Sequence, residues 1–190
     1  MTEQRLVKRS ITAIFLAAQI LLVMVLAARG NESYIRGIVA TTALWLCYDY
    51  LEFKFHLLMS NYIRAIVVVT LLSDGFFGYY LEFYLTSTVF DKLLHGFGTY
   101  SFALFGYILA AQLSKHSMSW RFTFFLVVCL GISMGAVYEV LEFIVDSTTH
   151  PVPLGQPSLL DTDLDLVADI FGAILAAFHA SSVKFINQKY

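Results

Sequence analysis

The sequence predicts an all-α, polytopic transmembrane helix bundle of about six helices, forming a single integral membrane domain over residues 1–190. Hydrophobic residues make up 58% of the chain and charged residues only 14%, with a mean hydropathy of +0.72. Soluble domains carry about 25% charged residues, so long apolar segments must account for the deficit. All three prolines lie between Pro151 and Pro157, which leaves the rest of the chain free to form uninterrupted helices.

The same composition excludes several classes of protein. A net charge of −2 argues against a nucleic-acid binder, because affinity for phosphates requires clustered Lys and Arg. The two cysteines, Cys47 and Cys129, both lie inside apolar segments, so neither a disulfide framework nor a cysteine-based zinc site is expected. Membrane lipid is the expected surrounding partner.

Six segments have the length of about 20 apolar residues that crosses a bilayer: 11–28, 34–58, 62–84, 93–113, 121–145 and 164–183. The first follows basic residues and looks like a signal peptide, but it exceeds the about 7–15 residues of a signal core. We therefore expect a retained helix. The third is interrupted at Ser73-Asp74-Gly75. The connection 146–163 is the longest and holds every proline, and loops of that length are often functional or mobile.

The distribution of basic residues predicts an N-in, C-in orientation in the cell (plasma or inner) membrane. In this arrangement nine of the 12 Lys and Arg residues face the cytoplasm: Arg5, Lys8, Arg9, Lys54, Arg64, Lys115, Arg121, Lys184 and Lys189. Only Arg29, Arg36 and Lys92 fall outside. The acidic residues then gather near the non-cytoplasmic face: Glu82, Asp91, Glu139, Glu142, Asp146, Asp161, Asp163, Asp165 and Asp169.

Ionisable residues at helical spacing line three of the predicted helices near that face. In the fourth segment, Asp91 and His95 are four residues apart and share a side of the helix, and Thr99 and Gly106 continue this stripe. In the fifth, the shared side carries Gly131, Gly135, Glu139, Glu142 and Asp146. In the sixth it carries Asp161, Asp165, Asp169 and Gly172. Glycines at such positions let neighbouring helices approach closely.

The depth of these acids predicts a cation site. Glu139 lies six residues before Val145, or about 9 Å from the helix end, and Asp169 is about as deep from the other direction. Ionised side chains in hydrocarbon cost at least a few kcal/mol, so the acids must face one another, a water-filled cavity or a cation. Oxygen ligands favour Mg²⁺, Mn²⁺ or Ca²⁺, and one imidazole also admits Zn²⁺ or Fe²⁺. The predicted metal ligands are Asp91, His95, Glu139, Asp165 and Asp169, with Glu142 as a catalytic general base.

Other acids have plainer interpretations. Asp161 and Asp163 are expected to be helix caps, Glu142 and Asp146 could equally lie solvated among lipid headgroups, and Tyr138 is expected on a different, packed face.

On the second segment, Asp49, Glu52 and His56 form either a metal pair of the Glu-x3-His type or, as we favour, an interfacial charged turn. Asp74 lies in mid-membrane, where a lone acid indicates function, and it could face the main cavity together with Glu82.

Three motifs in order resemble the VanZ-like membrane family: Asp91-Lys-Leu-Leu-His95, Glu139-Val-Leu-Glu142 and Asp165-Leu-Val-Ala-Asp169-Ile-Phe-Gly172. That family has Gln where this chain has Glu142, and Asn where it has Asp169. These departures make the chain more similar to the YjdF-type family of bacterial inner-membrane proteins, which has no assigned activity. The resemblance covers about the last half of the chain, and it implies the helical fold and the site rather than a reaction.

Three functions fit these observations. The first is a metal-dependent hydrolase or transferase that acts on a lipid-linked or cell-envelope substrate. The second is a small transporter, or an ion- or proton-binding membrane protein, in which the acids form a pathway. The third is a non-catalytic assembly protein whose acids organise helix packing. The sequence leaves open the substrate, the reaction, the metal, the oligomeric state and the roles of Asp49, Glu52, His56 and Asp74.

Overall fold

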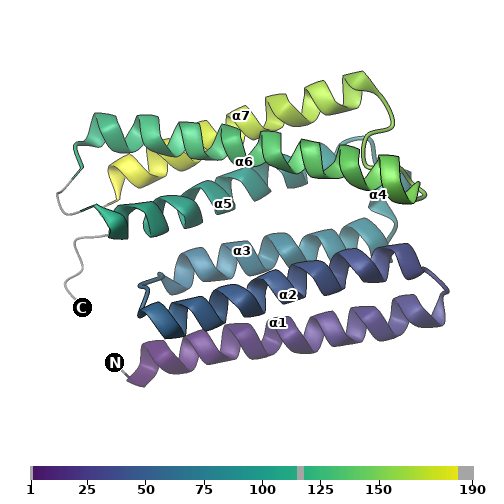
Figure 1. Cartoon of the computed structure of the whole chain (residues 1–190), viewed down its shortest axis with the longest axis horizontal. Coiled ribbons are helices and arrows are strands. Elements are labelled where there is room, and N and C mark those ends of the chain that lie inside the picture. The colour runs from purple at the N-terminus through teal and green to yellow at the C-terminus, as the bar shows by residue number, and fades with distance from the viewer. Residues whose placement is uncertain (1, 115–117, 184–190) are drawn as a thin grey trace. The chain divides into compact units, whose positions relative to one another are not determined.

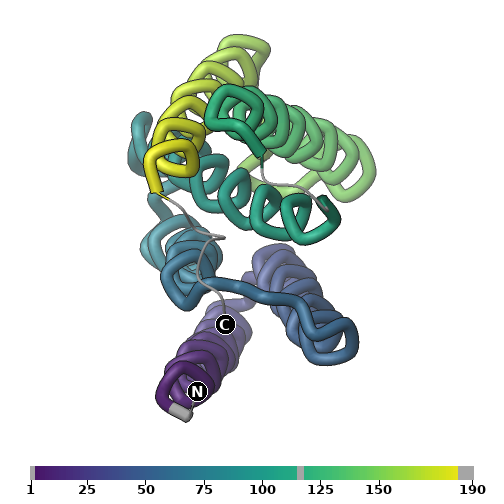
Figure 2. The backbone as a smooth tube through the Cα atoms, turned by 90° about the vertical axis from the view of Figure 1, so that its left-hand side faces the viewer, coloured from purple at the N-terminus to yellow at the C-terminus, as the bar shows by residue number. Residues whose placement is uncertain are grey.

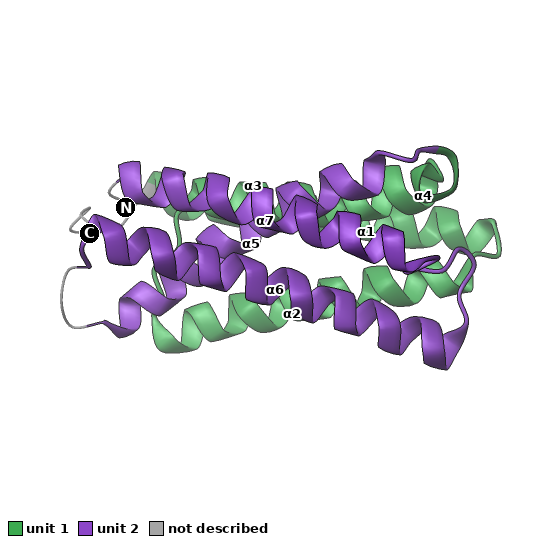
Figure 3. Ribbon diagram, turned by 90° about the horizontal axis from the view of Figure 1, so that it is seen from above, with its two compact units in different colours: residues 1–86 green, residues 87–190 purple. Residues whose placement is uncertain are grey.

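A computed structural model describes residues 2–114 and 118–183, and within these ranges the chain is helical, with no strand. The chain divides into two compact units, residues 1–86 and 87–190, which are coloured separately in Figure 3. The single domain predicted for residues 1–190 stays a prediction, and the two units are described one at a time.

The first unit consists of α1 (Thr2–Ala28), α2 (Glu32–Phe55), α3 (Asn61–Ser73), the π-helix η1 (Asp74–Tyr80) and the short α4 (Phe83–Thr86) (Figure 1). Ser60 caps α3 by accepting a hydrogen bond from the backbone N–H of Tyr62. The interruption predicted at Ser73-Asp74-Gly75 is the point where α3 becomes η1. Here the hydroxyl of Tyr84 donates to Asp74 Oδ1 at 2.6 Å, and the ring of Tyr84 lies where a Cβ at Gly78 would be.

The second unit consists of α5 (Phe90–Leu113), α6 (Trp120–Thr149) and α7 (Leu159–Ser182), three helices of one bundle (Figure 2). Ser119 caps α6 and Ser158 caps α7. The helices are longer than the apolar segments 93–113, 121–145 and 164–183, so the predicted connection 146–163 shrinks to residues 150–158. A hydropathy pattern ends at the last apolar residue, whereas α6 continues through a polar turn to Thr149 and α7 begins earlier, next to the capping Ser158.

Small residues bring the helices of the second unit together, as the glycine pattern predicted. A Cβ on Gly131 would lie 2.5 Å from that of Ala173, and a Cβ on Gly172 would overlap the carbonyl oxygen of Gly96. These contacts and the hydrogen bond between Thr99 and Asp169 show that α5 and α7 run parallel, and that α6 runs antiparallel to both. The N-terminal ends of α5 and α7 therefore lie beside the C-terminal end of α6.

Five helical stretches of the described residues are long and apolar enough to cross a membrane: 3–28, 61–80, 90–113, 120–149 and 159–182. The predicted span 34–58 is not among them, because α2 carries Arg36, Asp49, Glu52 and Lys54 along its length. The protein is thus a multi-pass membrane protein. The N-in, C-in orientation stays a prediction, and three residues that support it, Lys115, Lys184 and Lys189, lie outside the described residues.

Candidate functional site

One end of the second unit gathers eight ionisable side chains, here called the His95 cluster. It comprises Asp91, Lys92, His95, Glu139, Glu142, Asp161, Asp165 and Asp169. The helix ends that meet there supply them: α5 and α7 near their starts, and α6 near its end. Four members are almost fully buried, with exposed fractions of 8% for His95, 5% for Glu139, 1% for Asp165 and 2% for Asp169.

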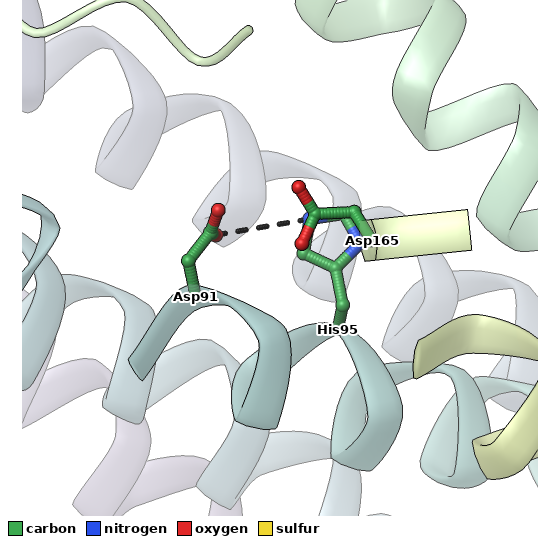
Figure 4. Close-up of side chains that lie close together, drawn as sticks. All are labelled: Asp91, His95 and Asp165. Atoms are coloured by element: carbon green, nitrogen blue, oxygen red, sulfur yellow. Dashed lines mark ion pairs between the residues drawn. The ribbon is translucent and has the colours of Figure 1, made fainter. Parts of the chain in front are cut away.

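His95 has carboxylates on both sides of its ring. Its Nδ1 lies 3.5 Å from Asp169 Oδ1 and 3.7 Å from Glu139 Oε1, and its Nε2 lies 3.8 Å from Asp91 Oδ1. Figure 4 shows Asp91 and His95 rising from the same helix, with the carboxylate of Asp165 next to the ring. The i,i+4 spacing of Asp91 and His95 thus places them on one face. Tyr138, expected on a different face, packs edge-on against the His95 ring with centroids 5.4 Å apart.

Asp169 accepts a hydrogen bond from α5 and packs against α6 at a position that has no side chain. The Thr99 hydroxyl donates to Asp169 Oδ1 at 2.5 Å. The other oxygen, Oδ2, lies over Gly135, where a Cβ would overlap the carboxylate. Gly135 therefore provides the space that the Asp169 side chain fills.

Glu139 is held by the connection between α6 and α7. The Gln156 amide donates to Glu139 Oε2 at 2.6 Å and to the Glu139 carbonyl at 2.8 Å. Asp146 fixes this segment by accepting the backbone N–H groups of Gly155 at 3.0 Å and Gln156 at 2.8 Å. Asp146 thus orders the loop and is not simply solvated. Gln156 could not be identified from the sequence, because a loop residue has no periodicity that indicates where its side chain points.

Lys92 binds the outer part of the cluster. Its ammonium donates to Asp91 at 3.0 Å, to Asp165 at 2.9 Å and to Asp161. This corrects the interpretation of Asp161 as a cap: Ser158 is the cap of α7, and Asp161 lies in its first turn and pairs with Lys92 across the helices. Asp163 is exposed.

Three buried carboxylate oxygens of the cluster have no hydrogen-bond partner in the described structure: Glu139 Oε1, Asp165 Oδ1 and Asp169 Oδ2. Two sets of potential ligand atoms lie within 4.8 Å of one another, and both include His95: Asp91, His95 and Asp165, and His95, Glu139 and Glu142. Atoms around a common ion at about 2.0–2.6 Å are separated by roughly 3–5 Å. The spacing therefore fits a metal ion, and Glu142 lies among the candidate ligands as well as being the predicted base.

The second group of acids belongs to a different structure in the first unit, here called the Arg64 cluster: Lys8, Asp49, Glu52 and Arg64. Arg64, 1% exposed, binds both oxygens of Glu52 at 2.7 and 2.8 Å, and lies 3.5 Å from Asp49. Lys8 pairs with the same two acids at 2.8 and 3.4 Å. His56 is exposed and ends α2 in the left-handed conformation, with a φ of 53°. The Glu52-x3-His56 spacing therefore does not assemble a metal pair.

A multi-pass helical membrane protein with a buried, acid-rich histidine cluster is the class that this fold and site define. The chain belongs to the DUF2238 family of predicted membrane proteins, whose pattern matches residues 8–184. An uncharacterised protein from Thermotoga maritima is 30% identical over 100 residues, which are 53% of this chain and 52% of that protein. The chain thus spans about half the length of this relative. No solved structure matches the chain.

Proposed function

We propose that the His95 cluster binds one divalent cation, with His95, Glu139, Glu142 and Asp169 as its ligands. The observation that carries this proposal is the set of buried carboxylate oxygens without a hydrogen-bond donor. A buried ionised oxygen without a partner is costly. A divalent cation at this point supplies the missing partner to several oxygens at once.

The distribution of positive charge supports a cation site on the Nδ1 side of the His95 ring. Lys92 neutralises the acids on the Nε2 side, Asp91 and Asp165. On the Nδ1 side, the only ion-pair partner of Glu139 and Asp169 within the described residues is His95 itself. An excess of carboxylate therefore faces Nδ1, and one imidazole with several carboxylates is a ligand set for Mn²⁺, Fe²⁺ or Zn²⁺, with Mg²⁺ and Ca²⁺ as harder competitors.

A hydrolase or transferase acting on a lipid-linked or cell-envelope substrate is the activity that we infer for such an ion. When bound, the ion would lower the pKa of a water molecule or polarise a phosphoryl or carbonyl oxygen. Glu142 is less buried than Glu139 and lies nearer the end of α6, so it can reach both the ion and a substrate entering from that end, as a general base would.

The interior beyond the cluster favours an enzyme over a transporter. Towards the other end of the second unit, most buried positions are filled by small or apolar residues such as Ala103, Leu104 and Ala173, and the buried hydroxyl of Ser101 bonds to the Phe97 carbonyl within its own helix. The polar side chains of Tyr100 and His179 in that direction bond to each other at 2.5 Å. A conduction path through this unit would need polar groups that continue inward from the acids, and this packing does not supply them.

Within its family we infer that the chain is closer to the YjdF-type proteins than to the VanZ-like ones. Glu142 and Asp169 support this, since they replace the amides of the VanZ-like motifs by carboxylates. Carboxylates at both positions add negative charge to the cation site.

Metal analysis of the full-length protein tests the proposal. The protein is purified in detergent without chelators, equilibrated with Mn²⁺ or Zn²⁺, desalted and analysed by mass spectrometry of the elements. We expect about one ion per chain in the wild type and a loss of the ion in Glu139→Gln and Asp169→Asn. Asp163→Asn is the matched control, because Asp163 is an exposed acid of α7.

The absence of bound metal in the wild type, or its full retention in both site variants, would refute the proposal. If the ion is present, lipid extracts of cells with and without the protein separate the activities. A lipid that accumulates without the protein, and also in Glu142→Gln cells, supports a hydrolase or transferase.

A further inference from the structure

Lys92 is surrounded as a bound cation would be. Its ammonium contacts one oxygen from each of three carboxylates, those of Asp91 on α5 and of Asp161 and Asp165 on α7. An ammonium has three donors and no acceptor, so these contacts use its full bonding capacity. Three carboxylate oxygens thus contact one positive charge, as the ligands of a bound cation do.

The same corner holds ligand atoms that Lys92 does not use. Asp165 Oδ1 is buried and has no hydrogen-bond partner in the described structure, and Asp165 itself is 1% exposed. Asp91 Oδ1 faces His95 Nε2 at 3.8 Å. Asp91 and Asp165 each offer an oxygen, and these two atoms lie within 4.8 Å of each other and of His95, a spacing that suits a cation.

We propose that the Lys92 ammonium fills the second of two adjacent cation positions in the His95 cluster and so limits the protein to one divalent ion. The inference rests on the proposed function, which assigns the first position to the Nδ1 side of His95. The second position, bounded by Asp91, Asp161 and Asp165, suits a divalent cation with oxygen ligands such as Mn²⁺. Lys92 supplies a charge that cannot dissociate from the protein.

The arrangement of His95 is consistent with this division. With an ion at Nδ1, the ring carries its proton on Nε2, which faces Asp91. A metal-ligating histidine commonly donates its other N–H to a carboxylate, which fixes the orientation of the ring. Asp91 therefore has two tasks, holding the Lys92 ammonium with one oxygen and orienting His95 with the other.

Replacement of Lys92 tests the proposal. Wild type, Lys92→Met and Lys92→Arg are purified as full-length chains, equilibrated with Mn²⁺ and desalted. We expect one Mn²⁺ per chain in the wild type and in Lys92→Arg, which keeps the charge, and two in Lys92→Met. The electron paramagnetic resonance spectrum of Lys92→Met should show two magnetically coupled Mn²⁺ ions, because the positions share one cluster. Lys54→Met removes a lysine of the first unit and should leave the count at one.

The outcomes separate this inference from the proposed function. One ion in both the wild type and Lys92→Met refutes the inference and leaves the proposed site intact, and two ions in the wild type also refute it. No ion in the wild type refutes the proposed function; one ion in Lys92→Met would then support the Lys92 position by itself, and none would refute both. If Lys92→Met does not fold, Lys92→Gln takes its place, because it keeps a hydrogen-bond donor without the charge and leaves all three carboxylates intact. Two ions in that variant support the inference and one ion refutes it.

Discussion

The Arg64 cluster and the His95 cluster are both buried groups of charges that join three helices, but they differ in balance. The Arg64 cluster has two basic and two acidic side chains, and its arginine binds both oxygens of Glu52. The His95 cluster has six carboxylates against Lys92 and His95. The positive and negative charges of the Arg64 cluster balance, whereas the His95 cluster has an excess of negative charge.

The unpaired atoms of the two clusters have opposite chemistry. In the Arg64 cluster, the charged side-chain atom without a partner is Nε of Arg64, a hydrogen-bond donor. In the His95 cluster, the unpaired atoms of Glu139, Asp165 and Asp169 are all acceptors. A charge network that serves only to hold helices together would be expected to pair its own charges. The difference supports the proposal that the His95 cluster binds a cation, and we infer a structural role for the Arg64 cluster.

The largest expected effect tests the structural role of the Arg64 cluster. Arg64→Met leaves the carboxylate of Glu52 buried without its main partner, and breaking a buried ion pair in this way costs about 3–5 kcal/mol. We expect a clear fall in the thermal unfolding temperature of the detergent-solubilised protein. Arg36→Met, at an exposed arginine of α2, is the control and should change little.

The double variant Arg64→Met/Glu52→Gln sharpens this test, because it removes both buried charges and should be more stable than Arg64→Met alone. Equal stability of Arg64→Met and wild type would contradict the structural role.

The next effect concerns the response to a divalent cation. An ion that binds only the folded state stabilises it by about 2.7 kcal/mol at 100 times its dissociation constant, so Mn²⁺ should raise the unfolding temperature of the wild type. Glu139→Gln should lose this increase and, without metal, should be at least as stable as the wild type, since it removes surplus charge.

Glu52→Gln makes the opposite change in the other cluster. It should lower the unfolding temperature with and without Mn²⁺ while keeping the metal-dependent increase. The comparison fails if the metal stabilises Glu139→Gln as much as the wild type, or if both variants respond alike.

Helical spacing explains why much of the His95 cluster could be predicted from the sequence. Residues four apart, such as Asp91 and His95, must share a face, and the glycine stripe of α6 correctly indicated close helix contacts. The partner of Asp161 could not be found in this way. It is Lys92, 69 residues away on another helix, and no spacing within α7 points to it.

Departures from the predicted helices also have physical causes. The span expected at 34–58 rested on apolar residues, yet α2 also carries Asp49 and Glu52, which pair within the Arg64 cluster and lower the hydropathy of that helix. The π-helix begins at Asp74, which accepts a hydrogen bond from Tyr84, ten residues further along. Sequence patterns within one helix describe its faces, but its ends and distortions depend on contacts made after folding.

A smaller effect is expected where α6 makes room for Asp169. In Gly135→Ala the new methyl group overlaps the Asp169 carboxylate, and such overpacking costs about 1–3 kcal/mol. Because the carboxylate must move, we expect weaker Mn²⁺ binding as well as a lower unfolding temperature. Gly106→Ala is the matched control: its methyl group would be 3.7 Å from Met134 Sδ, an ordinary contact. Equal behaviour of the two variants would show that the place of Asp169 does not depend on Gly135.

The smallest effect should come from replacing Gln156. This variant tests how much the loop contributes to the cation site. Gln156→Ala removes the hydrogen bonds to Glu139 Oε2 and to its carbonyl, at a net cost of about 0.5–1.5 kcal/mol for a typical bond. Glu139 remains as a ligand with greater freedom, so Mn²⁺ should still bind, one ion per chain, but with a several-fold weaker affinity in a competition titration. Gln112→Ala is the control, since that amide bonds to Ile108 within α5. Complete loss of the ion in Gln156→Ala would mean that the loop is itself part of the ligand set, and unchanged affinity would mean that the helices alone position Glu139.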